Sequence, residues 1–140
     1  MLIINRSYLA EVNFASAPAA GQRFFFGDIP ALRTVFTHGI EAISASQLST
    51  SPTGKTVNTQ ANCATLMLTL AIGDTEEVYQ IPVTSLISTL NGGFIRQFNG
   101  KRINLPKSYV TSVTTGISAN QSILFNFYYS PQPPAPAKNR

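Results

Sequence analysis

The clearest strand signal in this sequence is the run Ile123-Leu124-Phe125-Asn126-Phe127-Tyr128-Tyr129. Its odd-numbered positions are all apolar or aromatic, whereas the even-numbered positions include Asn126. Because successive side chains of a strand point to opposite faces, this alternation predicts a β-strand with one strongly apolar face. We expect Phe127, in the middle of that face, to lie in the core.

Residues 64–72 predict a second strong strand, with leucine at positions 66, 68 and 70 and isoleucine at 72 on one face. Gly73-Asp74 offers a turn, and residues 78–82 return as a strand. The sequence therefore predicts a hairpin over residues 64–83.

Shorter apolar or alternating runs predict further strands, and the polar residues 44–60 between them predict a long loop or a pair of ragged strands. A glycine at position 39 inside one run predicts a β-bulge. One short helix is predicted near residues 84–91, where Thr84 is a suitable cap and Asn91-Gly92-Gly93 a strong stop. Seven or eight short strands separated by turn signals predict an all-β fold, an antiparallel sandwich or a barrel. The further strands are residues 23–26, 32–43, 94–98, 103–105 and 109–115.

The chain of 140 residues is long enough for one domain and short for two. Residues 1–21 contain many small residues and predict an extended N-terminal arm, and residues 22–130 form the predicted β-sandwich domain. Residues 131–140 carry four prolines and two cations, which predicts a Pro-rich basic tail outside the core. We identify neither a secretory signal nor an apolar run near the roughly 20 residues of a membrane-spanning helix.

The composition is polar but weakly ionic, with 44 Ser, Thr, Asn and Gln residues against 16 charged ones. An ordinary monomeric enzyme keeps its copies apart partly through abundant mixed charge. Few charges together with many aromatic and amide side chains indicate a surface covered largely by copies of the same chain. A monomer with a Ser/Thr-rich surface is the alternative.

The charges are distributed unevenly along the sequence. All six carboxylates lie at or before Glu77, so residues 1–77 carry four cations and six acids (net −2), and residues 78–140 carry six cations and no acid (net +6). Four of these cations, which we call the basic window, occur within 12 residues and are interleaved with Phe94, Phe98 and Tyr109. Cations beside aromatic rings are typical of single-strand binders, but a solvated hairpin or a subunit or membrane contact fits as well. The basic window consists of Arg96, Lys101, Arg102 and Lys107.

Catalytic and metal-binding chemistry has few candidate residues. His38 is the single histidine and Cys63 the single cysteine, and a triad or a metal site needs several such partners. Glu76 and Glu77 are adjacent, and on a strand they would point to opposite faces. We therefore predict no catalytic residue, no metal, no cofactor and no small-molecule substrate, and we expect Cys63 to be a buried structural thiol.

The small-residue arm, the strands, the single short helix, the low charge, the acid-free basic half and the Pro-rich tail together resemble coat proteins of small icosahedral viruses and phages. The resemblance lies in overall character and not in a signature motif. It implies a jelly-roll sandwich that assembles with copies of itself and with other capsid proteins, through its faces and arms. It also implies a location in the virion after synthesis in the host cytoplasm, with a basic surface toward the genomic nucleic acid or an internal membrane. The main shell, a vertex and a minor or decoration position are all open.

A single-stranded nucleic-acid-binding β-barrel module is the competing class. In that reading residues 96–109 would lie along the bound strand, with the basic window holding its phosphates.

Overall fold

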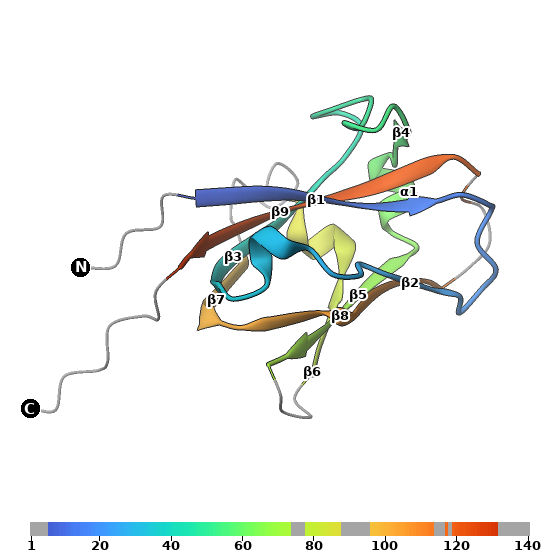
Figure 1. The fold of residues 1–140 in the computed structure, drawn as a ribbon. Helices are drawn as coiled ribbons and strands as arrows, with labels where there is room; N and C mark the ends of the chain where they lie inside the picture. Colours follow the sequence, from blue (N-terminus) through green and yellow to red (C-terminus); the bar gives the residue numbers. More distant parts are fainter. Residues whose placement is uncertain (1–5, 74–77, 88–95, 114–116, 118, 132–140) are drawn as a thin grey trace, which may run out of the picture.

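The computed structural model describes residues 6–73, 78–87, 96–113, 117 and 119–131, and for residues 60 and 96–99 it describes the backbone alone. The described chain is mostly β and folds as an antiparallel β-sandwich of two sheets (Figure 1). The described strands are β1 (Arg6–Phe14), β2 (Arg23–Phe25), β3 (Phe36–Ile43), β4 (Thr56–Val57), β5 (Leu66–Ile72), β6 (Val78–Pro82), β7 (Arg96–Lys101), β8 (Ile103–Ser112) and β9 (Gln121–Ser130).

The strand order is that of a jelly roll. The first sheet has the order β1-β9-β3-β7 and the second the order β2-β8-β5-β6, and the two-residue β4 adds to β9 in parallel. Apart from β4, the first strand pairs with the last, the second with the second-last, and so on inward to the β5–β6 hairpin. Such nesting arises when one long antiparallel hairpin is rolled into two sheets, which is the jelly-roll architecture. The predicted sandwich is confirmed, and the described strands form two sheets and not one closed barrel.

The core lies between the two sheets. Ile123, Phe125 and Phe127 of β9 are fully buried, as the alternation predicted. Phe26 follows β2 and packs from the opposite side, with its ring centroid 5.6 Å from that of Phe125 and 5.9 Å from that of Phe127. Aromatic rings at such distances add attraction beyond their buried area.

The predicted hairpin over residues 64–83 is confirmed by the pairing of β5 with β6. The predicted bulge at Gly39 is also confirmed, since the register of β3 against both β9 and β7 shifts between Thr37 and Gly39. The chain before β3 differs from the prediction, because Pro30–Leu32 forms a 3-10 turn (η1) and the strand begins only at Phe36.

The N-terminal arm predicted over residues 1–21 needs correction. Residues 6–14 form β1, which pairs with β9 over its whole length. Ala10, Val12 and Phe14 alternate along β1 and are buried in the core. The small Ala10 fits there because it lies opposite the large Phe125. The sandwich domain therefore begins at β1, and residues 1–5 lie outside the described residues.

The helices also differ from the prediction. The helix expected near residues 84–91 is a 3-10 helix, η2 (Val83–Leu86), which ends because Ile87 is extended and forms a bridge to Ala42 of β3. Residues 88–91 lie outside the described residues. A one-turn helix, α1 (Gln60–Cys63), was not predicted. Its first turn begins at Thr59, whose Oγ1 accepts a hydrogen bond from the backbone N–H of Asn62 at 3.2 Å.

The two strands predicted over residues 103–105 and 109–115 form one strand, β8, which contains Pro106. Thr69 of β5 lies opposite Tyr109 of β8, and Ala71 lies opposite Asn104, so three extra residues of β8 bulge from the ladder around Pro106. The buried Ser108 hydroxyl accepts a hydrogen bond from the Ala71 N–H at 3.0 Å and donates one to the Asn104 carbonyl at 2.8 Å. A proline is tolerated within a strand at such a bulge.

Phe127→Ala should lower the free energy of unfolding by roughly 3–5 kcal/mol, because it leaves a cavity beneath Phe26 and Phe125. Chemical denaturation of the two proteins measures this difference. Tyr8→Ala is the matched control, since Tyr8 lies opposite Phe127 on β1 but is 37 % exposed. A loss at position 127 no larger than at position 8 would contradict the placement of Phe127 in the core.

Candidate anionic-partner interface

The charge asymmetry of the sequence does not divide the molecule into two sides. In the first sheet β1 and β3 of the N-terminal half alternate with β9 and β7 of the C-terminal half. The second sheet alternates in the same way, with β2 and β5 beside β8 and β6. In the first sheet the nested pairing thus places the acid-free β9 and β7 next to β1 and β3, which carry Glu11 and Glu41.

The basic window is split between the two sheets. Arg96 and Lys101 are the first and last residues of β7 in the first sheet, whereas Lys107 lies in β8 of the second. Lys101 is half-buried, and Arg102 and Lys107 are exposed. The side chains of Arg96 and Phe98, and the whole of Phe94, lie outside what the structure describes. The described cations of the window therefore lie at the end of β7, at the connection to β8 and within β8.

Lys101 shares a cross-strand row with a cation that the sequence analysis did not select. Arg6 lies opposite Tyr129, Tyr129 opposite Thr37, and Thr37 opposite Lys101. At about 4.8 Å between neighbouring strands, this row separates the Arg6 and Lys101 backbones by about 14 Å. Arg6 lies on the edge strand β1 and Lys101 on the edge strand β7, at the same end of the first sheet. The two cations are therefore too far apart to form one compact anion site.

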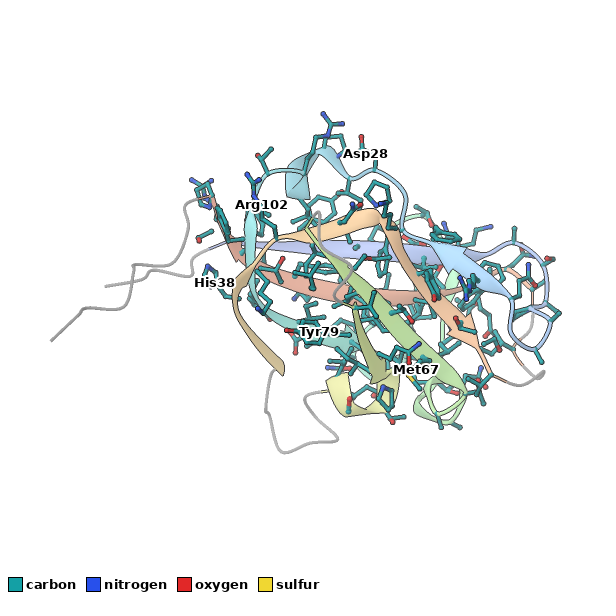
Figure 2. The ribbon with its side chains drawn as sticks, turned by 90° about the horizontal axis from the view of Figure 1, so that it is seen from below. Asp28, His38, Met67, Tyr79 and Arg102 are labelled. Atoms are coloured by element: carbon teal, nitrogen blue, oxygen red, sulfur yellow. The ribbon has the colours of Figure 1, made fainter. Side chains whose placement is uncertain are left out.

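A cavity of about 360 Å³ opens beside Arg102 at the end of the sandwich. Asp28 and Arg102 lie on the same side of the molecule there (Figure 2). Asp28 accepts hydrogen bonds from Arg33, which lower the pKa of its carboxyl group and offset the charge of that arginine. The Arg102 guanidinium lies 5.2 Å from the centroid of the Phe36 ring, within the range of a cation–π contact. The lining is formed by Asp28, Ile29, Leu32, Arg33, Gly73, Arg102, Ile103, Asn104, Leu105 and Pro106.

A second cationic cluster lies on the outer face of the second sheet. Phe25 of β2 lies opposite Tyr109 of β8, and their ring centroids are 5.1 Å apart with the planes tilted by 55°. The Arg23 guanidinium carbon lies 4.5 Å from the centroid of the same Tyr109 ring. Phe25 is 53 % exposed, and Lys107 is exposed two positions before Tyr109 on β8. We call Arg23, Phe25, Lys107 and Tyr109 the β2–β8 cluster.

Sequence reasoning selected Lys107 and Tyr109 but missed Arg23 and Phe25. The signal was present in the run Arg23-Phe24-Phe25-Phe26, where alternation places Phe25 opposite to its two neighbours. Phe24 and Phe26 pack against the core, and Phe25 points outward with Arg23. Arg23 and Phe25 could not be assigned to the outer face from the sequence, because the sequence does not show which side of β2 the other sheet covers.

The single histidine and the single cysteine are both buried. His38 Nε2 lies 2.7 Å from the Ser130 hydroxyl, and burial lowers the pKa of the imidazole. Cys63 is fully buried, which confirms that part of the prediction, and burial raises the pKa of its thiol to about 11. A thiol that remains protonated at neutral pH is a poor nucleophile. Among the described residues, no group of three or more His, Cys, Asp or Glu side chains could hold a metal ion.

The outer face of the first sheet carries a buried acidic network. Glu41 of β3 is 8 % exposed and accepts a hydrogen bond from the Tyr128 hydroxyl, and the Asn126 amide lies 3.4 Å from the same Glu41 oxygen. Burial and the neighbouring carboxylate raise the pKa of Tyr128 to about 12. This face therefore differs in charge from the β2–β8 cluster on the opposite sheet.

Comparison of the chain with protein-family models, with curated proteins and with solved structures found no match. The described part of the chain contains no helix of the length and apolarity needed to cross a membrane.

The Tyr128–Glu41 hydrogen bond should make the protein sensitive to alkali. Because the pKa of Tyr128 is raised on folding, its contribution to stability is complete below the unfolded value near pH 10. That contribution is lost as the pH rises toward about 12. Unfolding curves at stepped pH should show a steeper loss for the natural chain than for Tyr128→Phe across this window. Equal slopes for the two proteins would contradict the hydrogen bond.

Proposed function

We propose that the chain is a structural protein of a virus or phage particle, a capsid, vertex or minor capsid subunit that assembles with copies of itself and with other capsid proteins. The observation that carries this proposal is the nested pairing of the eight longer strands, first with last and inward to the β5–β6 hairpin. Jelly rolls with this order build many viral shells. The proposal places the protein in the virion, after synthesis in the host cytoplasm, in a role without catalysis.

The character of the described surface supports assembly. Large apolar side chains are exposed on both sheets and on the loop after β3, where a neighbouring copy can cover them. The low proportion of charged residues removes much of the repulsion that keeps copies of a monomeric protein apart. Apart from Phe25, which belongs to the β2–β8 cluster, the exposed large apolar residues are Tyr8, Leu48, Val78 and Val113.

Jelly rolls also serve in lectins and in metal-dependent enzymes, so the strand order alone does not assign the role. A metal-dependent enzyme needs several imidazole, thiolate or carboxylate ligands around one point. This chain has one histidine, and its His38 ring is hydrogen-bonded to Ser130 inside the first sheet. The available side chains therefore favour a function that works through contacts.

The purified full chain should form a closed particle or a ring of uniform mass, alone or when mixed with the other proteins of its particle. Size-exclusion chromatography with light scattering, followed by negative-stain electron microscopy, measures this. A monomer that persists at every concentration and in such mixtures would contradict the proposed role.

Val78→Asp tests whether the sandwich surface takes part in assembly. Val78 lies on the edge strand β6 and is 53 % exposed, so a charge there should leave the melting temperature nearly unchanged but lower the assembled fraction. Ala61→Asp adds the same charge at an exposed position of α1 and serves as the control. Equal assembly of the two variants would show that β6 makes no contact between copies.

The chain shortened after Ser130 separates assembly from folding. The four prolines after Ser130 cannot pair as a central strand, so the truncated chain should melt within about 2 °C of the full chain. If the tail joins neighbouring subunits, as in the proposed particle, the same truncation should lower the assembled mass. A larger fall in melting temperature would instead show that the tail packs on its own subunit.

A further inference from the structure

The outer face of the second sheet has an unusual composition for a solvent-exposed surface. Two cross-strand rows run over all four strands of this sheet. The described residues of these four strands include no carboxylate, and the cations among them are Arg23 and Lys107. The described strand residues are therefore complementary to an anion, because none of them repels it. The rows are Phe25-Tyr109-Thr69-Gln80 and Arg23-Thr111-Met67-Pro82.

The β2–β8 cluster combines an available ring with a positioned cation. The Phe25 ring is 53 % exposed, although its edge is supported by Tyr109 at a centroid distance of 5.1 Å. Arg23 lies over Tyr109 at 4.5 Å, which holds its guanidinium group close to the sheet while its N–H donors remain at the surface. No ion pair joins Arg23 to a carboxylate among the described residues. Its charge is therefore available to a ligand.

These two features favour a polymer that carries both phosphates and free aromatic faces. An unpaired base can stack on the exposed Phe25 ring, whereas the bases of a duplex are already stacked on one another. The arginine and the neighbouring lysine can hold the phosphates on either side of that base. A two-fold contact between copies of this face would bring Arg23 and Lys107 toward their own equivalents, which is unfavourable. An anionic lipid surface would use the cations but would not require an outward ring beside them.

We propose that the β2–β8 cluster is a binding site for single-stranded nucleic acid, in which Phe25 stacks on a base and Arg23 and Lys107 hold adjacent phosphates. The site recognises the polymer and not its sequence, because ring stacking accepts every base. This proposal rests on the geometry of the second sheet and not on the proposed particle. In a particle, it would assign this face to the genome.

The chain contains a matched control for this site. Arg23 and Phe25 alternate on β2, and Arg6 and Tyr8 alternate in the same spacing on β1 of the other sheet, where both are exposed. The variants Phe25→Ala, Arg23→Gln and Lys107→Gln should be compared with Tyr8→Ala and Arg6→Gln. Tyr8→Ala matches Phe25→Ala, and Arg6→Gln matches Arg23→Gln, so each of these two pairs removes an aromatic ring or an arginine charge at the cluster and away from it. Lys107→Gln removes the second cation of the cluster.

Fluorescence anisotropy with labelled oligothymidylate of about 12 nucleotides measures the affinity, in salt from about 50 to about 200 mM. Phe25→Ala should weaken binding about 5- to 150-fold, the range for loss of one stacked base, with an unchanged salt slope. Arg23→Gln and Lys107→Gln should each reduce the slope of log K against log salt by about 0.7. Tyr8→Ala and Arg6→Gln should bind as the natural chain does.

Several results would overturn the proposal. One is an absence of binding by the natural chain at the lowest salt, and another is an equal loss for the β1 and β2 variants, which indicates general charge attraction. A third is loss of binding in Lys101→Gln/Arg102→Gln with none in the cluster variants, which moves the site to the cavity at the sandwich end. Binding of anionic lipid vesicles with no binding of oligonucleotide would assign the face to a membrane. Light scattering should also be used to measure the assembled mass of Phe25→Ala. A variant that no longer assembles but binds the oligonucleotide with unchanged affinity would assign the face to a contact with a second copy. A failure of self-assembly with intact oligonucleotide binding would count against the particle alone.

Discussion

The burial and pairing of β9 impose the arrangement of the other strands. Ile123, Phe125 and Phe127 are fully buried, so the other sheet must cover the inner face of this strand. The backbone groups along its edges also need hydrogen-bond partners, which β1 supplies on one edge and β3 and β4 on the other. Since β1 begins at residue 6 and β9 ends at residue 130, this pairing closes the chain on itself. The inner pairs β2–β8, β3–β7 and β5–β6 then follow in nested order.

Nesting also decides where the charges lie. All the acids lie in one half of the sequence, but strands of the two halves alternate within each sheet. The difference in charge is therefore between the outer faces of the two sheets and not between the two halves of the chain. The first sheet carries Glu11 and Glu41 outward, whereas the described strands of the second carry Arg23 and Lys107. Partial burial of the Glu11 carboxylate is unfavourable, since it raises the pKa of the carboxyl group. Hydrogen bonds from Thr53, Ser51 and Ser122 more than compensate, so the net pKa is lowered and the loop after β3 is held against this face.

The two proposals use different parts of this surface. Assembly of copies is favoured by exposed apolar side chains such as Leu48 and Val78 and by the low overall charge. Binding of a polyanion is favoured at the β2–β8 cluster, where an exposed ring lies beside cations. A shell subunit must satisfy both requirements, because one surface meets its neighbours and another meets the contents. Val78 lies on the edge strand β6 and Leu48 on the loop after β3, whereas the cluster lies on β2 and β8.

The fold class and the strongest strands were predictable from the sequence, because alternation with a period of two is a local property of residues such as Phe125 and Phe127. The hairpin of β5 and β6 and the bulge at Gly39 were predictable for the same reason. Only the tertiary structure decided that residues 6–14 are a core strand, since Ala10 gains its place from Phe125, more than a hundred residues away. It also decided the candidate site: Lys107 and Tyr109 were selected as part of one basic window, but Arg23 and Phe25 join them only through the register of β2 against β8. Pairing between distant strands is set by the burial of whole faces and not by neighbours in the chain, which is why spacing alone could not reveal it.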